Sequence, residues 1–216
     1  MRNIKTPEER KNEILDTANR LFNEKGYDNT SVADIINEVG IAKGTLYYYF
    51  KSKEDIMDGI IEKTSEKLLA ASRQIADDDS LPVFEKMVKA IAALNLKEDE
   101  GKEIMEHIHK PQNALMHQKQ LSTMINGVTP ILTKIINQGI TEGIFKLRYP
   151  YETVEMIVIY VQNAFDDPMT GSLEDRQKRI IAFIYNVERL LGTPEGSLGF
   201  ITKLFNEWLG GYYRNE

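Results

Sequence analysis

Cysteine is absent from the 216 residues, which excludes disulfide bonds, thiolate metal sites and cysteine nucleophiles. The sequence also lacks a glycine-rich phosphate-binding loop, a nucleophile elbow and a paired His–Glu metal signature. Carboxylate pairs do occur, but on predicted helix surfaces, where a solvated charge is the usual state. We therefore expect no catalytic residues and no cofactor, and a protein that is not an enzyme.

Long apolar runs are missing as well. No run approaches the roughly 18 residues that a membrane-spanning helix needs. Met1 is followed by Arg2-Asn3-Ile4-Lys5 and a charged segment, not by the apolar core of a secretory signal. Together with the lack of cysteine, these absences predict a cytoplasmic protein with no membrane partner.

The whole chain has no excess of positive charge, which would favour nucleic-acid binding. Its formal net charge is −6. The charge is unevenly distributed, however. Residues 1–53 carry nine Lys and Arg against eight Asp and Glu, a balance of +1, so the remainder carries −7. Because affinity for DNA comes from local neutralisation of phosphates, this division is compatible with DNA binding by the N-terminal part.

Apolar residues recur with helical spacing almost throughout, and no stretch alternates with the period of two that a strand shows. Thr6-Pro7 begins the first predicted helix with a capping hydroxyl and a proline at the first helical position. Gly26 ends this helix, and a second helix with its apolar residues at Val32, Ile35, Ile36 and Val39 ends at Gly40. A third helix is predicted from Lys43 to Phe50 and a fourth from about Ser52 to Ala76.

The clearest break in the chain is Asp77-Asp78-Asp79-Ser80 with Pro82, which we interpret as a solvated loop. Gly127 and Pro130 mark a point where one of the later helices could be interrupted. Beyond the break, the sequence predicts helices at about 82–96, 101–109, 112–142, 151–166, 173–191 and 195–210.

Residues 30–50 have the pattern of a helix-turn-helix, two short helices joined by Gly40-Ile41-Ala42. Gly40 supplies the positive φ that the tight turn needs. We expect Ile35, Val39, Ile41 and Leu46 to face inward and to set the angle between the helices. Such a unit is too small to hold its shape alone, so further apolar side chains must complete its core: Ile14, Ala18, Phe22, Phe50 and Ile56.

The second helix of this motif has the features of a recognition helix, whose first residues meet base edges in the major groove. Gly44 allows close approach of the backbone, and Lys43 and Thr45 offer donors to phosphates or bases. The hydroxyls of Tyr47 and Tyr48 can donate to phosphates, and their rings can touch thymine methyl groups. Lys53, at the start of the next helix, adds a charge for a backbone phosphate.

The sequence resembles the tetracycline-repressor (TetR) family over residues 7–67. The match is sharpest in Thr30-Ser31-Val32-Ala33-Asp34-Ile35, in the run from Gly40 to Phe50 and in Lys51-Ser52-Lys53-Glu54-Asp55. The resemblance implies an all-α homodimer with a three-helix head at 1–53, a ligand-binding and dimerisation domain at 54–216, and about nine or ten helices. By position, the family's DNA contacts fall on Thr30 or Ser31, Lys43, Gly44, Thr45, Tyr47, Tyr48 and Lys53.

Two positions depart from the family pattern. Ala42 stands where serine is frequent, which removes one hydroxyl contact to phosphate. Ile36 stands where alanine is usual, which would separate the two helices slightly.

Other readings of the same residues stay open. Tyr47 and Tyr48 could form an aromatic hinge against the first helix, and Tyr49 is equally suited to the interface and to the core. His107, His109 and His117 could suggest a metal, but residues two apart point to different faces of a helix, so we propose no metal site.

The family resemblance implies a small-molecule pocket, and its candidate residues are methionines and aromatics of the C-terminal part, although plain core is the more frequent role for each of them taken singly. They are Phe84, Met87, Met105, Met116, Met124, Tyr160 and Phe165. The amphipathic segments 151–165 and 176–191 are candidates for a four-helix dimer interface, unless their apolar faces are satisfied within the monomer. The interface candidates are Val154, Val158, Val161, Ile181, Ile184 and Tyr185.

The sequence therefore predicts a ligand-responsive DNA-binding regulator. Its partners are double-stranded operator DNA, a second copy of the chain and a small-molecule effector of unknown identity. Repression relieved by the effector is the favoured mode. Activation with the same fold and a helical adaptor without DNA binding are the alternatives.

Overall fold

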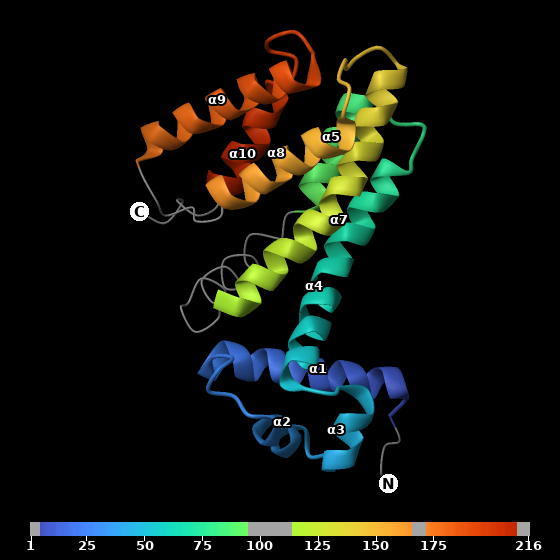
Figure 1. The fold of residues 1–216 in the computed structure, drawn as a ribbon, viewed down its shortest axis with the longest axis vertical. Coiled ribbons are helices and arrows are strands. Elements are labelled where there is room, and N and C mark those ends of the chain that lie inside the picture. Colours follow the sequence, from blue (N-terminus) through green and yellow to red (C-terminus); the bar gives the residue numbers. More distant parts are fainter. Residues whose placement is uncertain (1–4, 95–113, 166–171, 211–216) are drawn as a thin grey trace. The chain divides into compact units, whose positions relative to one another are not determined.

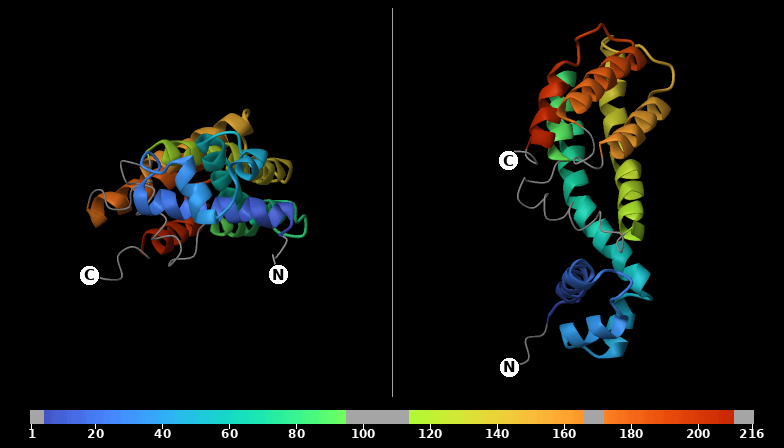
Figure 2. Two further views of the ribbon diagram at one scale, coloured as in Figure 1. Left: turned by 90° about the horizontal axis from the view of Figure 1, so that it is seen from below. Right: turned by 90° about the vertical axis from the view of Figure 1, so that its left-hand side faces the viewer.

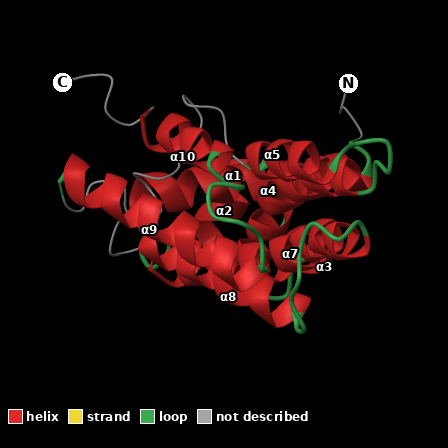
Figure 3. Ribbon diagram, turned by 90° about the horizontal axis from the view of Figure 1, so that it is seen from above, coloured by secondary structure: helices red, strands yellow, loops and turns green. Residues whose placement is uncertain are grey.

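The computed structural model describes residues 5–94, 114–165 and 172–210, and every regular element within these ranges is an α-helix (Figure 1, Figure 3). The all-helical prediction is confirmed, whereas the helix predicted at 101–109 lies outside the described residues. The helices are α1 (Pro7–Lys25), α2 (Val32–Val39), α3 (Lys43–Tyr49), α4 (Lys53–Ala76), α5 (Val83–Ala93), α7 (Ala114–Thr141), α8 (Pro150–Ala164), α9 (Leu173–Leu191) and α10 (Phe200–Gly210).

The described chain divides into two compact units. We call residues 5–66 and 114–123 the head, and residues 67–94, 124–165 and 172–210 the body. The head extends past the boundary predicted at residue 53, because α4 buries Ile56, Met57, Ile60 and Ile61 in the head core. Helices α4 and α7 each contribute residues to both units.

Local caps fix where the head helices begin and end. The Thr6 hydroxyl accepts from the Glu9 N–H at 3.2 Å, and the Glu9 carboxylate accepts from the Thr6 N–H at 2.7 Å, which starts α1 as predicted. The Gly26 N–H donates to the Phe22 carbonyl at 2.9 Å where α1 ends. Ser31 and Asp34 form the equivalent box at the start of α2.

The head core is almost purely apolar. Helices α1, α2 and α3 gather around the first turns of α4, and two further views show the same grouping (Figure 1, Figure 2). Apart from Met116, the residues of the core are at most 3% exposed. They are Ile14, Leu15, Ala18, Leu21, Phe22, Ile35, Leu46, Phe50, Ile56, Met57, Ile60, Ile61 and Met116. All five side chains expected to complete the motif's core are among them.

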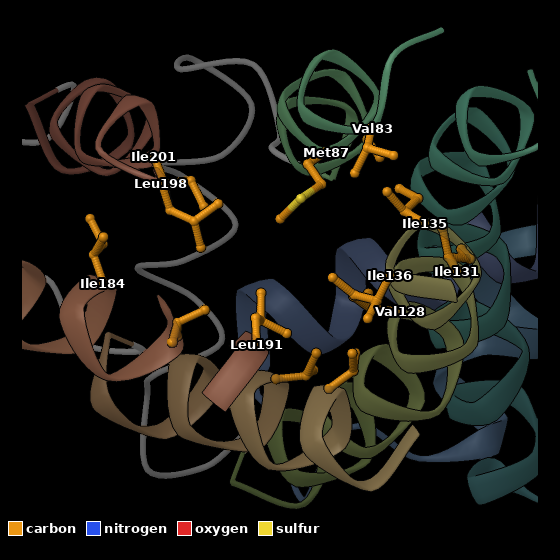
Figure 4. Close-up of a cluster of buried hydrophobic side chains, with 14 of the residues drawn as sticks. Val83, Met87, Val128, Ile131, Ile135, Ile136, Ile184, Leu191, Leu198 and Ile201 are labelled. Atoms are coloured by element: carbon orange, nitrogen blue, oxygen red, sulfur yellow. The ribbon is translucent and has the colours of Figure 1, made fainter. Parts of the chain in front are cut away.

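The body core is larger and is formed by several helices. Labelled side chains of α5, α7, α9 and α10 point into a common interior (Figure 4). Leu198, which precedes α10, is completely buried among them. An aromatic group of Tyr160, Phe165, Phe183 and Phe205 continues this core, with ring centroids 4.9–6.2 Å apart.

Two body elements differ in extent from the prediction. Helix α7 continues through Gly127 and Pro130 without a break. A Cβ on Gly127 would lie 2.4 Å from the Leu69 side chain, so glycine here serves close packing against α4. Helix α10 begins at Phe200, not near residue 195, because residues 194–199 form turns in which the N–H groups of Gly196 and Leu198 donate to the Glu188 carboxylate.

Candidate nucleic-acid interface

Helix α3 is held to the head by its inward residues. Leu46 is fully buried, Phe50 is 3% exposed, and Tyr49 packs half-buried against the same core. On the opposite face of this seven-residue helix, Lys43, Gly44, Tyr47 and Tyr48 are exposed and Thr45 is half-buried. That face carries the predicted recognition residues.

The turn between α2 and α3 has the geometry that the sequence predicted. Gly40 takes φ +71°, and its N–H donates to the Ile36 carbonyl at 3.0 Å. The Ile41 N–H donates to the same carbonyl at 3.2 Å. Ile35 is buried, and Val39 and Ile41 pack half-buried against the core, so the four residues expected to face inward all do so.

The exposed face of α3 combines a cation, an open backbone and aromatic rings. Tyr48 is 80% exposed and Tyr47 is 44% exposed, which removes the alternative of an aromatic hinge packed on α1. The Tyr48 ring meets Tyr49 edge-on at 5.0 Å, and the Lys43 ammonium lies 5.8 Å from the centre of the Tyr47 ring. A Cβ built on Gly44 meets no atom within 4 Å, so another molecule can approach this backbone closely.

Thr30 requires a correction. Its side chain is fully buried, and its hydroxyl donates to the carbonyls of Gly26 at 2.9 Å and Leu21 at 3.2 Å. It therefore holds the connection between α1 and α2 and cannot reach DNA. Its neighbour Ser31 is exposed, but its hydroxyl donates to the Asp34 carboxylate at 2.6 Å and accepts from the Asp34 N–H at 3.1 Å.

The charge at the start of α2 follows from this capping box. The hydrogen bonds from the Ser31 hydroxyl and the Ser31 backbone N–H lower the pKa of Asp34. An ionised carboxylate at a helix start is favoured by the helix dipole. Any phosphate contact by Ser31 would thus lie beside a negative charge. The other two polar candidates are on α3, where Lys43 is exposed and Thr45 is half-buried.

Lys53 lies in surroundings that the sequence did not suggest. Its ammonium donates to the Tyr27 carbonyl at 2.7 Å and lies 4.1 Å from the centre of the Tyr27 ring. Tyr27 was not singled out from the sequence, although its position directly after the helix-ending Gly26 marked it as part of a turn. The Arg20 guanidinium, also not singled out, donates to Glu24 on α1 and to Glu38 on α2, joining the two helices.

The candidate pocket residues do not form one group. Met87 and Phe165 are buried in the body core, with Phe84 and Met124 packed half-buried against it. Met116 belongs instead to the head core, so its placement in a body pocket was wrong. Tyr160 is 45% exposed and stacks on Phe183, and Met105 lies outside the described residues.

The candidate dimer residues also divide. Val154, Val158 and Ile184 are at most 6% exposed in the body core, so their assignment to a dimer interface was wrong: these faces are satisfied within one chain. Val161 packs half-buried against the same core. Ile181 is 64% exposed and Tyr185 is 45% exposed. Met156, Ile159 and Tyr160 of α8 are exposed as well, at 43–51%.

Other classes of site find no support within the described residues. His117 lies half-buried on α7, and His107 and His109 lie outside those residues. Among the residues that were placed, no group of three acidic or histidine side chains could hold a metal ion. No helix in the described ranges is long and apolar enough to cross a membrane.

Comparison with known proteins agrees with this geometry. Residues 14–60 match the family described as bacterial regulatory proteins of the tetR family, and residues 97–184 match the tetracyclin repressor-like C-terminal domain. The HTH-type transcriptional repressor KstR2 of Mycobacterium tuberculosis is 27% identical over 157 residues, covering 71% of this chain and 76% of that protein. The fatty acid metabolism regulator protein of Bacillus subtilis is 27% identical over 184 residues, covering 83% of this chain and 92% of that protein.

Solved structures share the fold. The fatty acid degradation regulator FadR from Bacillus halodurans aligns with a TM-score of 0.55 at 18% identity, covering 99% of this chain and 100% of that one. RolR without ligand aligns with a TM-score of 0.60 at 17% identity, covering 90% of this chain and 95% of that one. The helix-turn-helix geometry, the two family matches and the related repressor sequences agree: the chain belongs to the TetR family of bacterial DNA-binding transcriptional regulators.

Proposed function

We propose that this chain is a homodimeric repressor that binds a palindromic operator through α3 and is released from it by a small molecule bound in the body. The observation that carries the proposal is the outer face of α3, where Lys43, Gly44, Tyr47 and Tyr48 are exposed on a helix anchored by Leu46 and Phe50. A helical adaptor that does not bind DNA would leave this face without a role.

Dimerisation is supported by the exposed apolar side chains of α8 and α9. Ile181 and Tyr185 lie one turn apart on α9, and Met156, Ile159 and Tyr160 lie on α8. Two copies of this pair of helices would form a two-fold four-helix interface. Such symmetry would present two α3 helices to half-sites about one DNA turn, roughly 34–36 Å, apart.

The effector is inferred from the character of the body. Its core is apolar and aromatic, which suits a small apolar or amphipathic molecule. The names of the Bacillus relatives make fatty acids the first compounds to test. To release DNA, the effector must bind better to a state in which the two α3 helices are wrongly spaced. We propose α4 as the lever, because it contributes residues to both units.

DNA binding is tested by selecting duplexes from a random-sequence library with the purified full chain and measuring affinity for the selected duplex by gel retardation. Lys43→Ala and Tyr48→Ala should each weaken binding at least about tenfold, the effect of losing roughly 1.4 kcal/mol. Both side chains are exposed, so the circular dichroism spectrum should not change. Unaltered affinity in both variants would contradict the role given to α3.

The dimer and the effector are tested separately. Ile181→Asp should shift sedimentation at micromolar concentration from dimer to monomer, whereas Lys178→Asp, also exposed on α9, serves as the charge control.

A reporter gene placed behind the selected duplex should be silenced, and fatty acids should relieve the silencing. Higher reporter output in the presence of the protein would indicate an activator instead.

A further inference from the structure

The ammonium of Lys53 is already engaged within the head. It donates to the Tyr27 carbonyl at 2.7 Å and lies 4.1 Å from the centre of the Tyr27 ring, a distance at which a cation is attracted to an aromatic face. The side chain is half-buried, unlike those of Lys43 and Lys51, which precede it in the sequence and are exposed. These two contacts join residues that are 26 positions apart in the chain.

Tyr27 is itself firmly fixed. Its ring meets Phe22, which is fully buried, edge-on at 5.1 Å. Its carbonyl also accepts from the Thr30 N–H at 3.2 Å, and the buried Thr30 hydroxyl anchors the same connection to α1. Tyr27 is therefore part of the segment that determines where α2 begins.

Lys53 stands at the other end of the motif. Helix α3 ends at Tyr49, Phe50 is buried, and α4 begins at Lys53 with the Ser52 hydroxyl accepting from the Asp55 N–H at 3.0 Å. The contact between Lys53 and Tyr27 thus closes residues 27–53 into a loop that contains both helices of the helix-turn-helix. Without this contact, the end of α3 would no longer be tied to the segment before α2.

We infer that Lys53 is a positioning residue, which holds the angle of α3 through Tyr27, and not a neutralising partner of a DNA phosphate. The inference rests on the proposed DNA binding and assigns a different role to a residue that sequence position placed among the phosphate contacts. The two roles differ in their response to salt. A lost phosphate contact lowers the slope of log K against log salt by about 0.9 per head, whereas a lost positioning contact lowers affinity at unchanged slope.

The test uses the full-length protein and the duplex selected above, with affinities measured over a series of salt concentrations. Lys53→Met keeps the aliphatic stem and removes the charge, and Tyr27→Leu removes the ring without changing any charge. Each should weaken binding about tenfold at an unchanged salt slope. Lys53→Met removes both contacts, and Tyr27→Leu removes only the contact with the aromatic ring, because the carbonyl remains. The double variant should therefore bind within about twofold of Lys53→Met.

Three controls complete the design. Lys53→Arg keeps a donor and a cation and should restore binding to within about threefold of the unaltered protein. Tyr27→Phe keeps the aromatic ring and the carbonyl, and with them both contacts of Lys53, so it should bind about as well as the unaltered protein. The circular dichroism spectrum of Tyr27→Leu checks that this variant is folded. Lys51→Met removes an exposed charge two residues away and reports what a lost surface lysine does to the slope.

The possible outcomes are distinct. A slope reduced by about 0.9 per head in Lys53→Met, with additive effects in the double variant, would make Lys53 a phosphate contact and overturn the inference while DNA binding stands. Normal affinity of Lys53→Met would overturn it equally. If the unaltered protein selects no duplex, the proposed function fails and this inference falls with it.

Discussion

The head and the body differ in what fills their cores. The head core is a small apolar cluster whose helices are ended by local caps. The two buried ionisable side chains among the described residues, Lys86 and Glu188, both lie in the body and bond to segments outside their own helices. The head is thus specified by apolar shape, and the body also by directional bonds between separate segments. Variants that remove an apolar core side chain of the head, or a buried directional bond of the body, should therefore affect the stability of one unit more than that of the other.

The largest effect is expected from Phe22→Ala. Phe22 is fully buried in the head core, and truncating such a side chain costs about 3–5 kcal/mol. We expect the head to unfold first, with DNA binding lost while most of the helical signal persists. Denaturant titration followed by circular dichroism, alongside gel retardation, measures both. The exposed Tyr48→Ala should lose binding without any change in the transition. One transition that removes the whole helical signal would show that the units unfold together.

The second prediction concerns Glu188, whose side chain is 2% exposed. Its carboxylate accepts from the N–H groups of Leu198 at 2.8 Å and Gly196 at 2.9 Å, which fixes the turn before α10. Glu188→Ala leaves both donors without this acceptor and should cost about 2–4 kcal/mol of unfolding free energy. The exposed Glu195→Ala should change it by less than about 0.5 kcal/mol. Equal stability of the two variants would remove the contrast between head and body.

The same contrast explains how far the sequence predicts the structure. In the head, Thr6, Gly26 and Gly40 mark helix ends, and Ile35 and Leu46 mark the inward face, all through local pattern. The exception is also instructive. Thr30 and Ser31 are both hydroxyl residues at a helix start, and only tertiary packing decides that Thr30 is buried and Ser31 exposed.

In the body, periodicity predicts most helices but not which helix packs on which. The apolar faces of α8 and α9 were therefore assigned to a second chain, whereas Val154 and Ile184 fill the core of their own. Met116 was assigned to the body because it follows the head in sequence, yet it packs in the head core. The late start of α10 depends on a carboxylate eight residues before Gly196, which no local rule indicates.

A smaller effect is expected at the cap of α2. Ser31→Ala removes the acceptor of the Asp34 N–H, and losing such a cap costs about 1 kcal/mol. Ser31→Thr should retain most of it. Because the capping bonds lower the pKa of Asp34, its stabilising effect is present above the ordinary pKa of an aspartate and is lost as the pH falls through the lowered value. The free energy of unfolding of the head should therefore fall more at acid pH in the unaltered protein than in Ser31→Ala. The same dependence of this free energy on pH in both proteins would contradict the prediction.

The finest contrast lies between two threonines one turn apart on α7, both in the body. The Thr129 side chain is fully buried, and its hydroxyl donates to the Ile125 carbonyl at 2.7 Å. The Thr133 side chain is 8% exposed, and its buried hydroxyl has no hydrogen-bond partner among the described residues. Valine has nearly the same shape as threonine and is equally branched at Cβ, so replacing either residue changes mainly the hydroxyl. Thr129→Val should lower the unfolding free energy by about 1 kcal/mol, because a satisfied hydroxyl is lost. Thr133→Val should raise it by about the same amount, because an unpaired polar atom is replaced by an apolar one. Denaturant unfolding of the two variants measures the difference, and a loss of equal size in both would mean that the Thr133 hydroxyl is paired after all.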